Sequence, residues 1–423
     1  MPIPHAPSTR PLRILVVGAG VGGLSVARGL LRDGHDVTVF EQRPHLTPGG
    51  GAVTIWPNGA TVLRQLGVDM EGTGQLISTV RVHTLRGFAI TCLDVTAIAD
   101  RLGEPVRMVP RRVLLERLLD GFPADRVRCD ARAVTVLDTG TGARIEFADG
   151  SSAEGDVLIG ADGVHSVVRE LVGAPRARPT GWCSWQGLVT LPNIADKHIA
   201  LMMIGEHGNL GLWPAGGWAV QWWFDLPWSA DFVRPQRPLD MIRSNFTGWA
   251  NCVDQVLATL TDEDLAPSPF PHFRHPVPHA GQGAVTLLGD AAHTMPPTLA
   301  QGTNQALLDT MVLCEALSDS RVDVQGALRW YENTRRRKVK AVSWLTTQQV
   351  SHSEAALKPM AMVPDRFMTW ALTTFLRWTS HAKMSARISR DLYTRDHHPV
   401  VPLVSTAMNQ SGGVEHGTGE PPG

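Results

Sequence analysis

The feature that most constrains the fold is a glycine-rich turn near the start of the chain. The apolar run from Leu12 to Val17 is typical of a buried β-strand and leads directly into Gly18-Ala19-Gly20-Val21-Gly22-Gly23. A helical segment over residues 24–32 and a second strand over residues 37–40 follow, and that strand ends at Glu41. This order of strand, glycine turn, helix, strand and acid is that of a βαβ unit that binds a dinucleotide.

Each glycine of such a turn, and the acid after the second strand, has its own expected role. Gly18 permits the tight turn, Gly20 lets the backbone approach a pyrophosphate, and Gly23 lets the helix pack closely on the strand. Glu41 is placed to accept hydrogen bonds from ribose hydroxyls.

Two later segments repeat the pattern of a strand followed by an acid and a glycine. Residues 156–160 and 284–288 are apolar runs of strand length, and they lead into Asp162-Gly163 and Gly289-Asp290. Helices are expected after both, over residues 164–172 and 299–317. Open α/β sheets bind ligands at the carboxyl ends of their strands, so we expect the three loops to converge on one ligand.

The entry to the last of these helices is itself a candidate binding element. Pro296 and Pro297 bend the chain before Gln301-Gly302-Thr303-Asn304. A helix that starts here would point free N–H groups and a positive dipole end at the ligand. Asp290 is placed to accept hydrogen bonds from hydroxyl groups of the same ligand.

The middle of the chain has a different character. Eight of the 13 tryptophans fall between Trp182 and Trp249, in four segments with the pattern of antiparallel strands, and two short helices follow. No glycine-rich phosphate loop occurs there. We interpret residues 181–275 as an insertion in which most tryptophans form the core and a few line a site for a flat ligand.

Composition excludes several other functions. The net charge of −1 gives no reason to expect nucleic acid or an anionic membrane as partner. The five cysteines are odd in number and form no Cys-x-x-Cys pair, which argues against a disulfide framework or a metal site and fits a reducing cytoplasm. No signal peptide is visible, and no run of about 18 apolar residues predicts a membrane span.

The C-terminal part is predicted to be helical. The basic run Arg335-Arg336-Arg337-Lys338 is expected to be a solvated helix face. The apolar helix expected over residues 366–381 is expected to dock on the protein body or on a dimer partner, so the protein would be a monomer or a homodimer. Residues beyond Asp396 are expected to be disordered.

With all three loops considered, residues 12–345 resemble the single-component FAD-dependent aromatic hydroxylases, which are para-hydroxybenzoate hydroxylase-like flavoprotein monooxygenases. Within this family the chain is most similar to the salicylate hydroxylase branch. The resemblance implies an α/β fold with an α+β insertion: a Rossmann-like FAD-binding domain, an inserted antiparallel-sheet substrate domain and C-terminal helices. The FAD-binding domain is expected to comprise residues 11–79, 102–180 and 276–325, and the substrate domain residues 80–101 and 181–275. The C-terminal helices are expected over residues 326–397, and a disordered tail over residues 398–423.

The resemblance also implies which residues hold FAD. The glycine turn matches the ADP-binding fingerprint, Arg111 matches an arginine that touches FAD, and Asp290 matches the acid that holds the ribityl chain. The residues expected to contact the cofactor are Gly18, Gly20, Val21, Gly22, Gly23, Glu41, Arg43, Arg111, Asp162, Asp290, Pro297, Gly302, Thr303 and Asn304.

The implied reaction is the hydroxylation of a small-molecule aromatic substrate. NADPH or NADH, bound only transiently, reduces FAD; molecular oxygen then forms a flavin hydroperoxide, which transfers a hydroxyl group to the ring. Pro296 would shape the oxygen side of the site.

The sequence departs from the family pattern at two places. The branch usually has Glu-Asp where this chain has Leu308-Asp309, which we interpret as a surface change. No clear tyrosine or histidine matches a substrate-activating base; His83, His207 and Gln221 are the candidates to face the substrate. The aromatic-rich insertion favours a bulky apolar substrate of the polycyclic phenol, indole or quinolone type.

Other functions are compatible with the same motifs. An epoxidase or a prenyl-chain reductase would keep the fold and change the reaction, and a flavoprotein sensor or carrier would keep only the cofactor. A flavin-dependent halogenase is disfavoured because Trp182 and Trp185 do not form the Trp-x-Trp-x-Ile-Pro motif of those enzymes.

Overall fold

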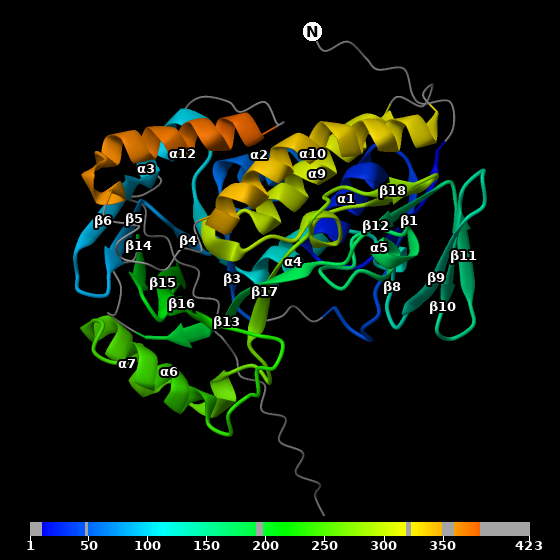
Figure 1. Cartoon of the computed structure of the whole chain (residues 1–423). Coiled ribbons are helices and arrows are strands. Elements are labelled where there is room, and N and C mark those ends of the chain that lie inside the picture. Colours follow the sequence, from blue (N-terminus) through cyan, green and yellow to red (C-terminus); the bar gives the residue numbers. More distant parts are fainter. Residues whose placement is uncertain (1–10, 47–49, 192–197, 319–322, 349–358, 381–423) are drawn as a thin grey trace, which may run out of the picture.

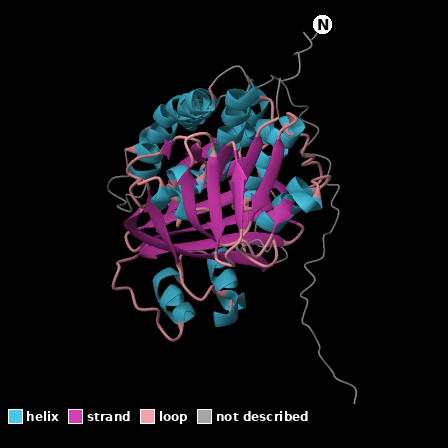
Figure 2. Cartoon of the chain, turned by 90° about the vertical axis from the view of Figure 1, so that its right-hand side faces the viewer, coloured by secondary structure: helices cyan, strands magenta, loops and turns pink. Residues whose placement is uncertain are grey.

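The computed structural model describes residues 11–46, 50–191, 198–318, 323–348 and 359–380. Two sheets dominate it, and they lie next to each other under a layer of helices (Figure 1). Figure 2 shows helices on both sides of the strands, with a pair of helices forming the layer below.

The first sheet has six strands in the order β18-β19-β12-β1-β2-β8. Five of them run parallel, and only the short edge strand β18 is antiparallel. The parallel sheet expected from the glycine turn is therefore confirmed. The strands are β1 (Arg13–Val17), β2 (Asp36–Phe40), β8 (Val127–Arg128), β12 (Val157–Gly160), β18 (Gly281–Gln282) and β19 (Val285–Leu287).

Helices cover this sheet and share its core. Apolar side chains of α1, α2, α4, α9 and α10 form one buried cluster with Ile14, Val16, Val37, Val39, Val157 and Ile159. The helices are α1 (Val21–Arg32), α2 (Pro57–Gln65), α4 (Arg111–Leu119), α9 (Gly302–Ser318) and α10 (Val324–Gln348). The helix after β12 was predicted over residues 164–172, but α5 spans only Val167–Leu171, because the Asp162 carboxylate accepts from the N–H groups of Val167 and Val168 and so marks its start.

The second sheet has seven strands in the order β17-β13-β16-β15-β14-β5-β6. Its pairs are antiparallel except β14 with β5, which is parallel. β5 comes from an earlier part of the chain. The four segments expected to form antiparallel strands, β13 to β16, pair antiparallel with one another as predicted. The strands are β5 (Thr79–Thr84), β6 (Ala89–Asp94), β13 (Arg178–Thr190), β14 (Ile199–Gly205), β15 (Gly208–Gly216), β16 (Ala219–Pro227) and β17 (Phe270–Arg274).

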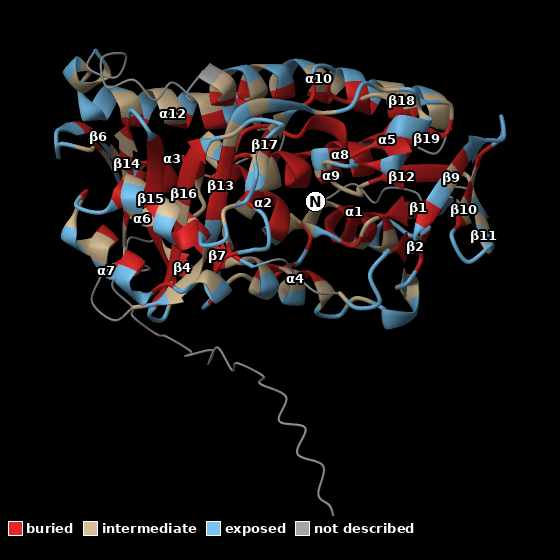
Figure 3. Ribbon diagram, turned by 60° about the horizontal axis from the view of Figure 1, so that its bottom comes forward, coloured by how far each residue is buried: buried red, intermediate tan, exposed pale blue. Residues whose placement is uncertain are grey.

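The two faces of this sheet have different neighbours. On one face Trp185, Trp222 and Phe224 pack in a buried cluster with α6 (Pro238–Phe246) and α7 (Asn251–Thr259). On the other face, which we call the cofactor-side face, Trp213 and Ala219 share a cluster with Trp56, the residue that precedes α2. Figure 3 shows buried residues running through both sheets.

The remaining elements join or flank the two sheets. A three-stranded sheet, β3 (Ala52–Ile55), β7 (Arg107–Pro110) and β4 (Gln75–Leu76), lies between them, and a second, β9 (Ala133–Asp138), β10 (Ala143–Phe147) and β11 (Ser152–Gly155), projects at the side. The remaining helices are α3 (Val95–Leu102) and α8 (Asp290–His293), and the short helical turns are Ala124–Arg126, Asp262–Asp264, Pro297–Leu299 and Met360–Met362.

The apolar helix expected near residue 366 is α12 (Asp365–Thr379), and it docks on the body of the protein. The Asp365 carboxylate accepts from the Cys92 N–H at 2.8 Å, and the Thr369 hydroxyl accepts from the Asp94 N–H at 3.1 Å. Its outer face exposes Phe367, Trp370 and Trp378. Within the described ranges no helix combines the length and apolarity that a membrane span requires. The predicted disordered tail lies outside the described residues.

Candidate active site

The cofactor loops meet at one edge of the six-stranded sheet. Gly18 follows β1, Glu41 follows β2, Asp162 lies just after β12, and Gly289-Asp290 follows β19. These four strands are neighbours in the order β19-β12-β1-β2 and run parallel. Their carboxyl ends therefore bring the loops together, as predicted from the sequence.

The three glycines of the turn meet different surroundings. A Cβ on Gly18, whose φ is +102°, would overlap the carbonyl oxygen of Ala161, and one on Gly23 would overlap that of Gly18. A Cβ on Gly20 would meet no atom within 4 Å, and Gly20 is exposed. Gly20 is also the N-cap of α1 and no side chain caps this helix, so its first N–H groups and positive dipole end face outward. This cradle fits a pyrophosphate.

Glu41 connects the glycine turn to the segment after β2. Its carboxylate accepts from the Ala19 N–H at 2.9 Å and from the Arg43 N–H at 3.1 Å. The acid is therefore held in place by backbone groups beside the turn, where a ribose would lie next to the pyrophosphate.

Asp290, Arg111 and the start of α9 form the other end of the candidate site. Burial lowers the pKa of the Arg111 guanidinium, and the nearby Asp290 carboxylate partly offsets that effect. Asp290 is exposed, and a Cβ on Gly302 would lie 3.9 Å from its Oδ1. The structure thus brings Arg111 of α4 close to Asp290 and the start of α9, which both lie far from it in the sequence.

Asn304 has a role that the sequence did not indicate. Its amide donates to the Thr54 carbonyl at 2.9 Å and to the Ala300 carbonyl at 2.8 Å, and its oxygen accepts from the Trp56 N–H at 2.9 Å. The buried side chain is fully engaged by backbone groups, so only the backbone at Asn304 is available to a ligand.

The Asp162-Gly163 loop and the helix after it are held by contacts within the protein. The Asp162 carboxylate accepts from the Ser166 hydroxyl at 2.5 Å and caps α5; burial raises its pKa, and these hydrogen bonds oppose the rise. Arg169, 1% exposed, donates to the carbonyls of Ala291 and Ala292 at 3.1 Å each. Arg169 therefore fixes α5 to α8, the short helix that begins at Asp290.

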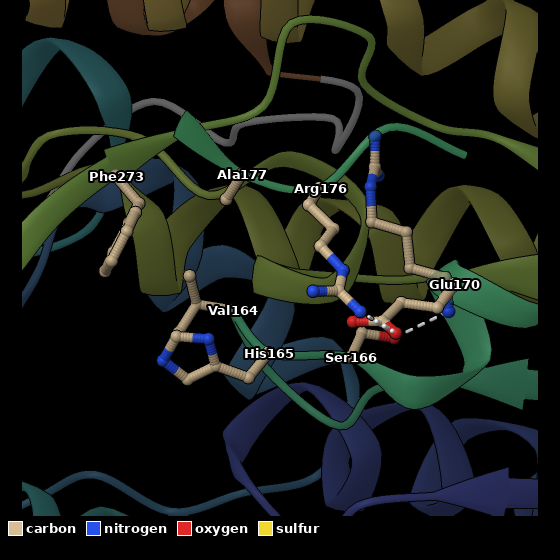
Figure 4. Close-up of a pocket in the computed structure, with 8 residues that line it drawn as sticks. Val164, His165, Ser166, Glu170, Arg176, Ala177 and Phe273 are labelled. Carbon is tan, nitrogen blue, oxygen red and sulfur yellow. Dashed lines mark hydrogen bonds and ion pairs between the residues drawn. The ribbon is translucent and has the colours of Figure 1, made fainter. Parts of the chain in front are cut away.

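A small hollow of about 120 Å³ lies beside this motif (Figure 4). Arg176 and Glu170 form a 2.6 Å ion pair on one side of it, and the His165 ring lies edge-on to Phe273. Neither Gly20 nor Asp290 lines it. The convergence of the four loops, rather than this hollow, defines the candidate cofactor site.

The four candidate catalytic residues are not gathered in one place. Pro296 is buried at the turn before α9. Gln221, on the cofactor-side face, accepts from the Ala52 N–H at 2.6 Å and donates to the Trp222 carbonyl at 3.1 Å, so its amide joins the sheet to β3. His83 pairs with Met203, whose side chain packs toward α6 and α7, and so His83 lies on the opposite face.

His207 is farther away. It is exposed in the turn between β14 and β15, at the end of the sheet away from Gln221. Because a strand rises about 3.3 Å per residue, roughly 20 Å separates His207 from the level of Gln221. Of the three polar candidates, only Gln221 adjoins the elements that carry the cofactor loops.

A buried polar cluster on the same face was not predicted. The Ser184 hydroxyl hydrogen-bonds the Asp225 carboxylate and lies 2.6 Å from His272 Nε2. Burial raises the pKa of Asp225 to about 7, against the lowering effect of the Ser184 hydrogen bond. The three residues come from β13, β16 and β17, so only the strand pairing reveals them.

Comparison with known proteins assigns the ligand of the converging loops. The model of the FAD binding domain family matches residues 12–346. The chain belongs to this family of FAD-binding proteins. The FAD-dependent urate hydroxylase of Klebsiella oxytoca is 34% identical over 332 residues, which cover 77% of this chain and 86% of that relative.

Solved structures agree with this assignment. The structure of Klebsiella pneumoniae HpxO complexed with FAD and uric acid has a TM-score of 0.78 and 27% identity, and the match covers 86% of this chain and 97% of that one. A salicylate hydroxylase substrate complex has a TM-score of 0.70 at 20% identity, covering 89% and 100%, which shows the same fold. The expected family and cofactor are confirmed, and the protein is an FAD-dependent monooxygenase.

The residues present fit FAD. Gly20 and the uncapped start of α1 suit the pyrophosphate, Glu41 suits a ribose, and Asp290 with the start of α9 suits the polar chain and ring of the flavin. The individual contacts stay predictions.

Two sequence interpretations are wrong. Leu308-Asp309 is not a surface change, because both side chains are fully buried. The basic run on α10 is not a uniformly solvated face, because Arg335 is 0% exposed and its Nε donates to Asp309 at 2.7 Å. Both errors have the same cause. Asp309 on α9 and Arg335 on α10 are hydrogen-bonding partners that lie 26 residues apart, so neither local sequence shows the contact.

Proposed function

We propose that the protein uses NAD(P)H and molecular oxygen to hydroxylate a flat, uncharged aromatic substrate larger than a single benzene ring. The observation that carries the substrate class is the absence of accessible charge in the middle of the second sheet. Strands β14, β15 and β16, together with residues 184–190 of β13, contain one charged residue, Asp225, and it is buried. A carboxylate substrate would find no cation on these strands to bind it.

Part of the cofactor-side face remains open. Trp223 and Met202 lie there in the middle of the sheet and are only partly buried. Leu188 is also partly buried, and Gln186, in register with Trp223, is exposed; both lie on the part of β13 that does not pair with β17. Mid-sheet side chains keep such exposure only where no protein element covers them. A bound aromatic molecule would cover this apolar area, and Gln186 would offer it one uncharged hydrogen-bonding group.

Trp223 gives this open area a flat surface. Its ring lies directly over Gly211 of the neighbouring strand, where a Cβ would overlap it, and the Trp213 ring is 6.0 Å away between centroids. Trp222 makes the corresponding contact with Gly187 on the opposite face but is completely buried. Only Trp223 of this pair is therefore available to stack on a substrate ring.

β3 connects this surface to the flavin loops. Its Ala52 N–H donates to Gln221, and the Thr54 carbonyl accepts from Asn304 at the start of α9. The two sides of the site are thus held at a fixed separation by one short strand. This arrangement suits a reaction in which the protein orients the substrate and excludes water.

When bound, FAD supplies the redox chemistry and the activation of oxygen. The chain itself would hold the cofactor at Gly20, Glu41 and Asp290, and the start of α9 would favour negative charge on the flavin ring. Pro296 would bound the oxygen side. An electron-rich neutral ring needs no strong base, in agreement with the absence of one from the open area of this face among the described residues.

A substrate panel tests this proposal. Neutral polycyclic phenols, indoles and quinolones are compared with benzoates of matched ring substitution, and NAD(P)H oxidation and product mass are measured for each. We expect kcat/KM to be at least about tenfold higher for the best neutral compound, because a buried unpaired carboxylate costs more than about 1.4 kcal/mol. Preferred turnover of a charged benzoate would contradict the proposal.

A further inference from the structure

We propose that Arg335 on α10 is a positioning residue for FAD that holds two segments in place at once: the Gly289-Asp290 loop and the start of α9 at Gly302. It belongs to none of the sequence motifs for FAD and lies on a C-terminal helix. The inference concerns how the cofactor is held and does not depend on which substrate is oxidised.

The first arm of the network leads from Arg335 to the Asp290 loop. The Arg335 Nε donates to Asp309 Oδ1 at 2.7 Å, and Asp309 Oδ2 accepts from the Gly289 N–H at 3.0 Å. Gly289 immediately precedes Asp290. The guanidinium therefore fixes, through one carboxylate, the backbone from which Asp290 projects.

The second arm leads to the start of α9. The Arg335 Nη2 donates to Gln305 Oε1 at 2.7 Å, and the Gln305 amide donates to Gln301 Oε1 at 3.1 Å. Gln301 directly precedes Gly302, and its oxygen also accepts from Asn58 on α2 at 3.1 Å. One guanidinium thus connects the two segments that face the flavin. Its planar fork of donors makes this double contact possible, and a lysine could not reproduce it.

The charges in this network indicate that Arg335 is the essential partner of the Asp309 carboxylate. Burial alone would raise the pKa of Asp309, but the neighbouring His293, His279 and Arg335 hold it well below its usual range. Burial lowers the pKa of His279 to about 4 despite Asp309 beside it, so that ring is neutral at pH 7. The permanent charge that balances Asp309 is that of Arg335.

The same contacts show that the cluster is not a metal site. His279, His293 and Asp309 could together offer ligand atoms within 4.8 Å of one another. However, both carboxylate oxygens already accept hydrogen bonds, and the Arg335 guanidinium contacts the oxygen that His279 also contacts. A cation placed there would face the guanidinium directly.

A stability role alone does not explain so many directed contacts. Buried ion pairs contribute little net stability compared with apolar side chains of similar volume, and their best-attested use is to specify an arrangement. Arg335, Asp309 and Gln305 are all 0% exposed. The arrangement specified here is the distance between the Asp290 loop and the start of α9.

Gln305→Met tests the second arm with little change of volume. It removes the side-chain hydrogen bonds to Arg335 and Gln301. It leaves the Arg335–Asp309 pair intact, and also the 3.3 Å contact of Arg335 Nη2 with the Gln305 backbone carbonyl. We measure FAD release on dilution of the purified holoenzyme by the recovery of flavin fluorescence, the flavin reduction potential, and the thermal unfolding midpoint without added FAD. Arg337→Met, two residues along the same basic run and exposed, is the matched control.

We expect Gln305→Met and Arg335→Lys to raise the FAD dissociation constant tenfold or more and to shift the potential to more negative values, because the start of α9 no longer faces the flavin in a fixed position. Arg337→Met leaves all three quantities unchanged. Wild-type affinity and potential in Gln305→Met would overturn the proposal. Failure of both network variants to fold would overturn it too, because the network would then serve stability and not cofactor position.

Discussion

At the scale of single residues, two glycines of the same turn, Gly18 and Gly20, are needed for different reasons. Gly18 is required by its positive φ and by the Ala161 carbonyl beside it, so its requirement comes from the protein itself. Gly20 has φ −75° and no neighbour within 4 Å of a Cβ. No contact within the described polypeptide requires glycine there, and we infer that the approach of a cofactor phosphate does.

This difference predicts opposite effects of two alanine substitutions. Gly20→Ala leaves the thermal unfolding midpoint of the FAD-free protein unchanged or slightly higher and weakens FAD binding about tenfold or more, because the methyl group occupies the phosphate's place. Gly18→Ala destabilises the fold by about 1–3 kcal/mol because of strain. Thermal unfolding and flavin fluorescence measure both. Undiminished FAD affinity in Gly20→Ala would show that the pyrophosphate does not bind there.

The roles of single residues could be predicted only where they depend on neighbours close in the sequence. Gly18, Gly20, Gly23 and Glu41 lie within one βαβ unit, and the close contacts at Gly18 and Gly23 agree with their predicted steric roles. The cofactor contacts of Gly20 and Glu41 stay predictions. Arg335 and Asp309 were misjudged because their burial depends on how α9 packs on α10, which a local pattern does not contain.

At the scale of elements, the second sheet separates structural from binding residues by its two faces. Alternate residues of β16 point to opposite sides, so Trp222 enters the core under α6 and α7 while Trp223 faces the cofactor side. The strands were predicted from their aromatic-rich segments. Which face would be covered was not, because α6, α7 and β3 come from other parts of the chain.

The two glycines under these tryptophans give a matched pair of tests. In Gly211→Ala the new Cβ displaces the partly exposed Trp223 ring from the open face. We expect KM for a neutral aromatic substrate to rise about tenfold, which corresponds to the loss of about one stacking contact. FAD affinity stays the same. In Gly187→Ala the Cβ lies 2.8 Å from the buried Trp222 ring, so we expect a loss of about 1–3 kcal/mol of stability and an unchanged KM. Steady-state kinetics and thermal unfolding distinguish them. Equal effects on KM would contradict the assignment of Trp223 to the substrate side.

At the scale of the whole molecule, function depends on how the two sheets are held together. β3 touches both sides of the site, α10 holds the flavin loops from behind through Arg335, and α12 docks on β6 at the far edge of the second sheet. The sequence predicted both sheets and the converging loops, because each is built from short periodic segments. It did not predict β3 as the connection, since a four-residue strand carries too little periodicity to be recognised.

The central claim is that the assembled molecule transfers one atom of molecular oxygen to its substrate. The direct test is turnover of the purified holoenzyme with NAD(P)H, the best substrate of the panel and isotopically labelled oxygen gas, with product mass measured. We predict that each product molecule carries a single oxygen atom derived from the gas, with one NAD(P)H consumed per product. Oxygen derived from water, or a product that gains two hydrogens and no oxygen, would contradict the account.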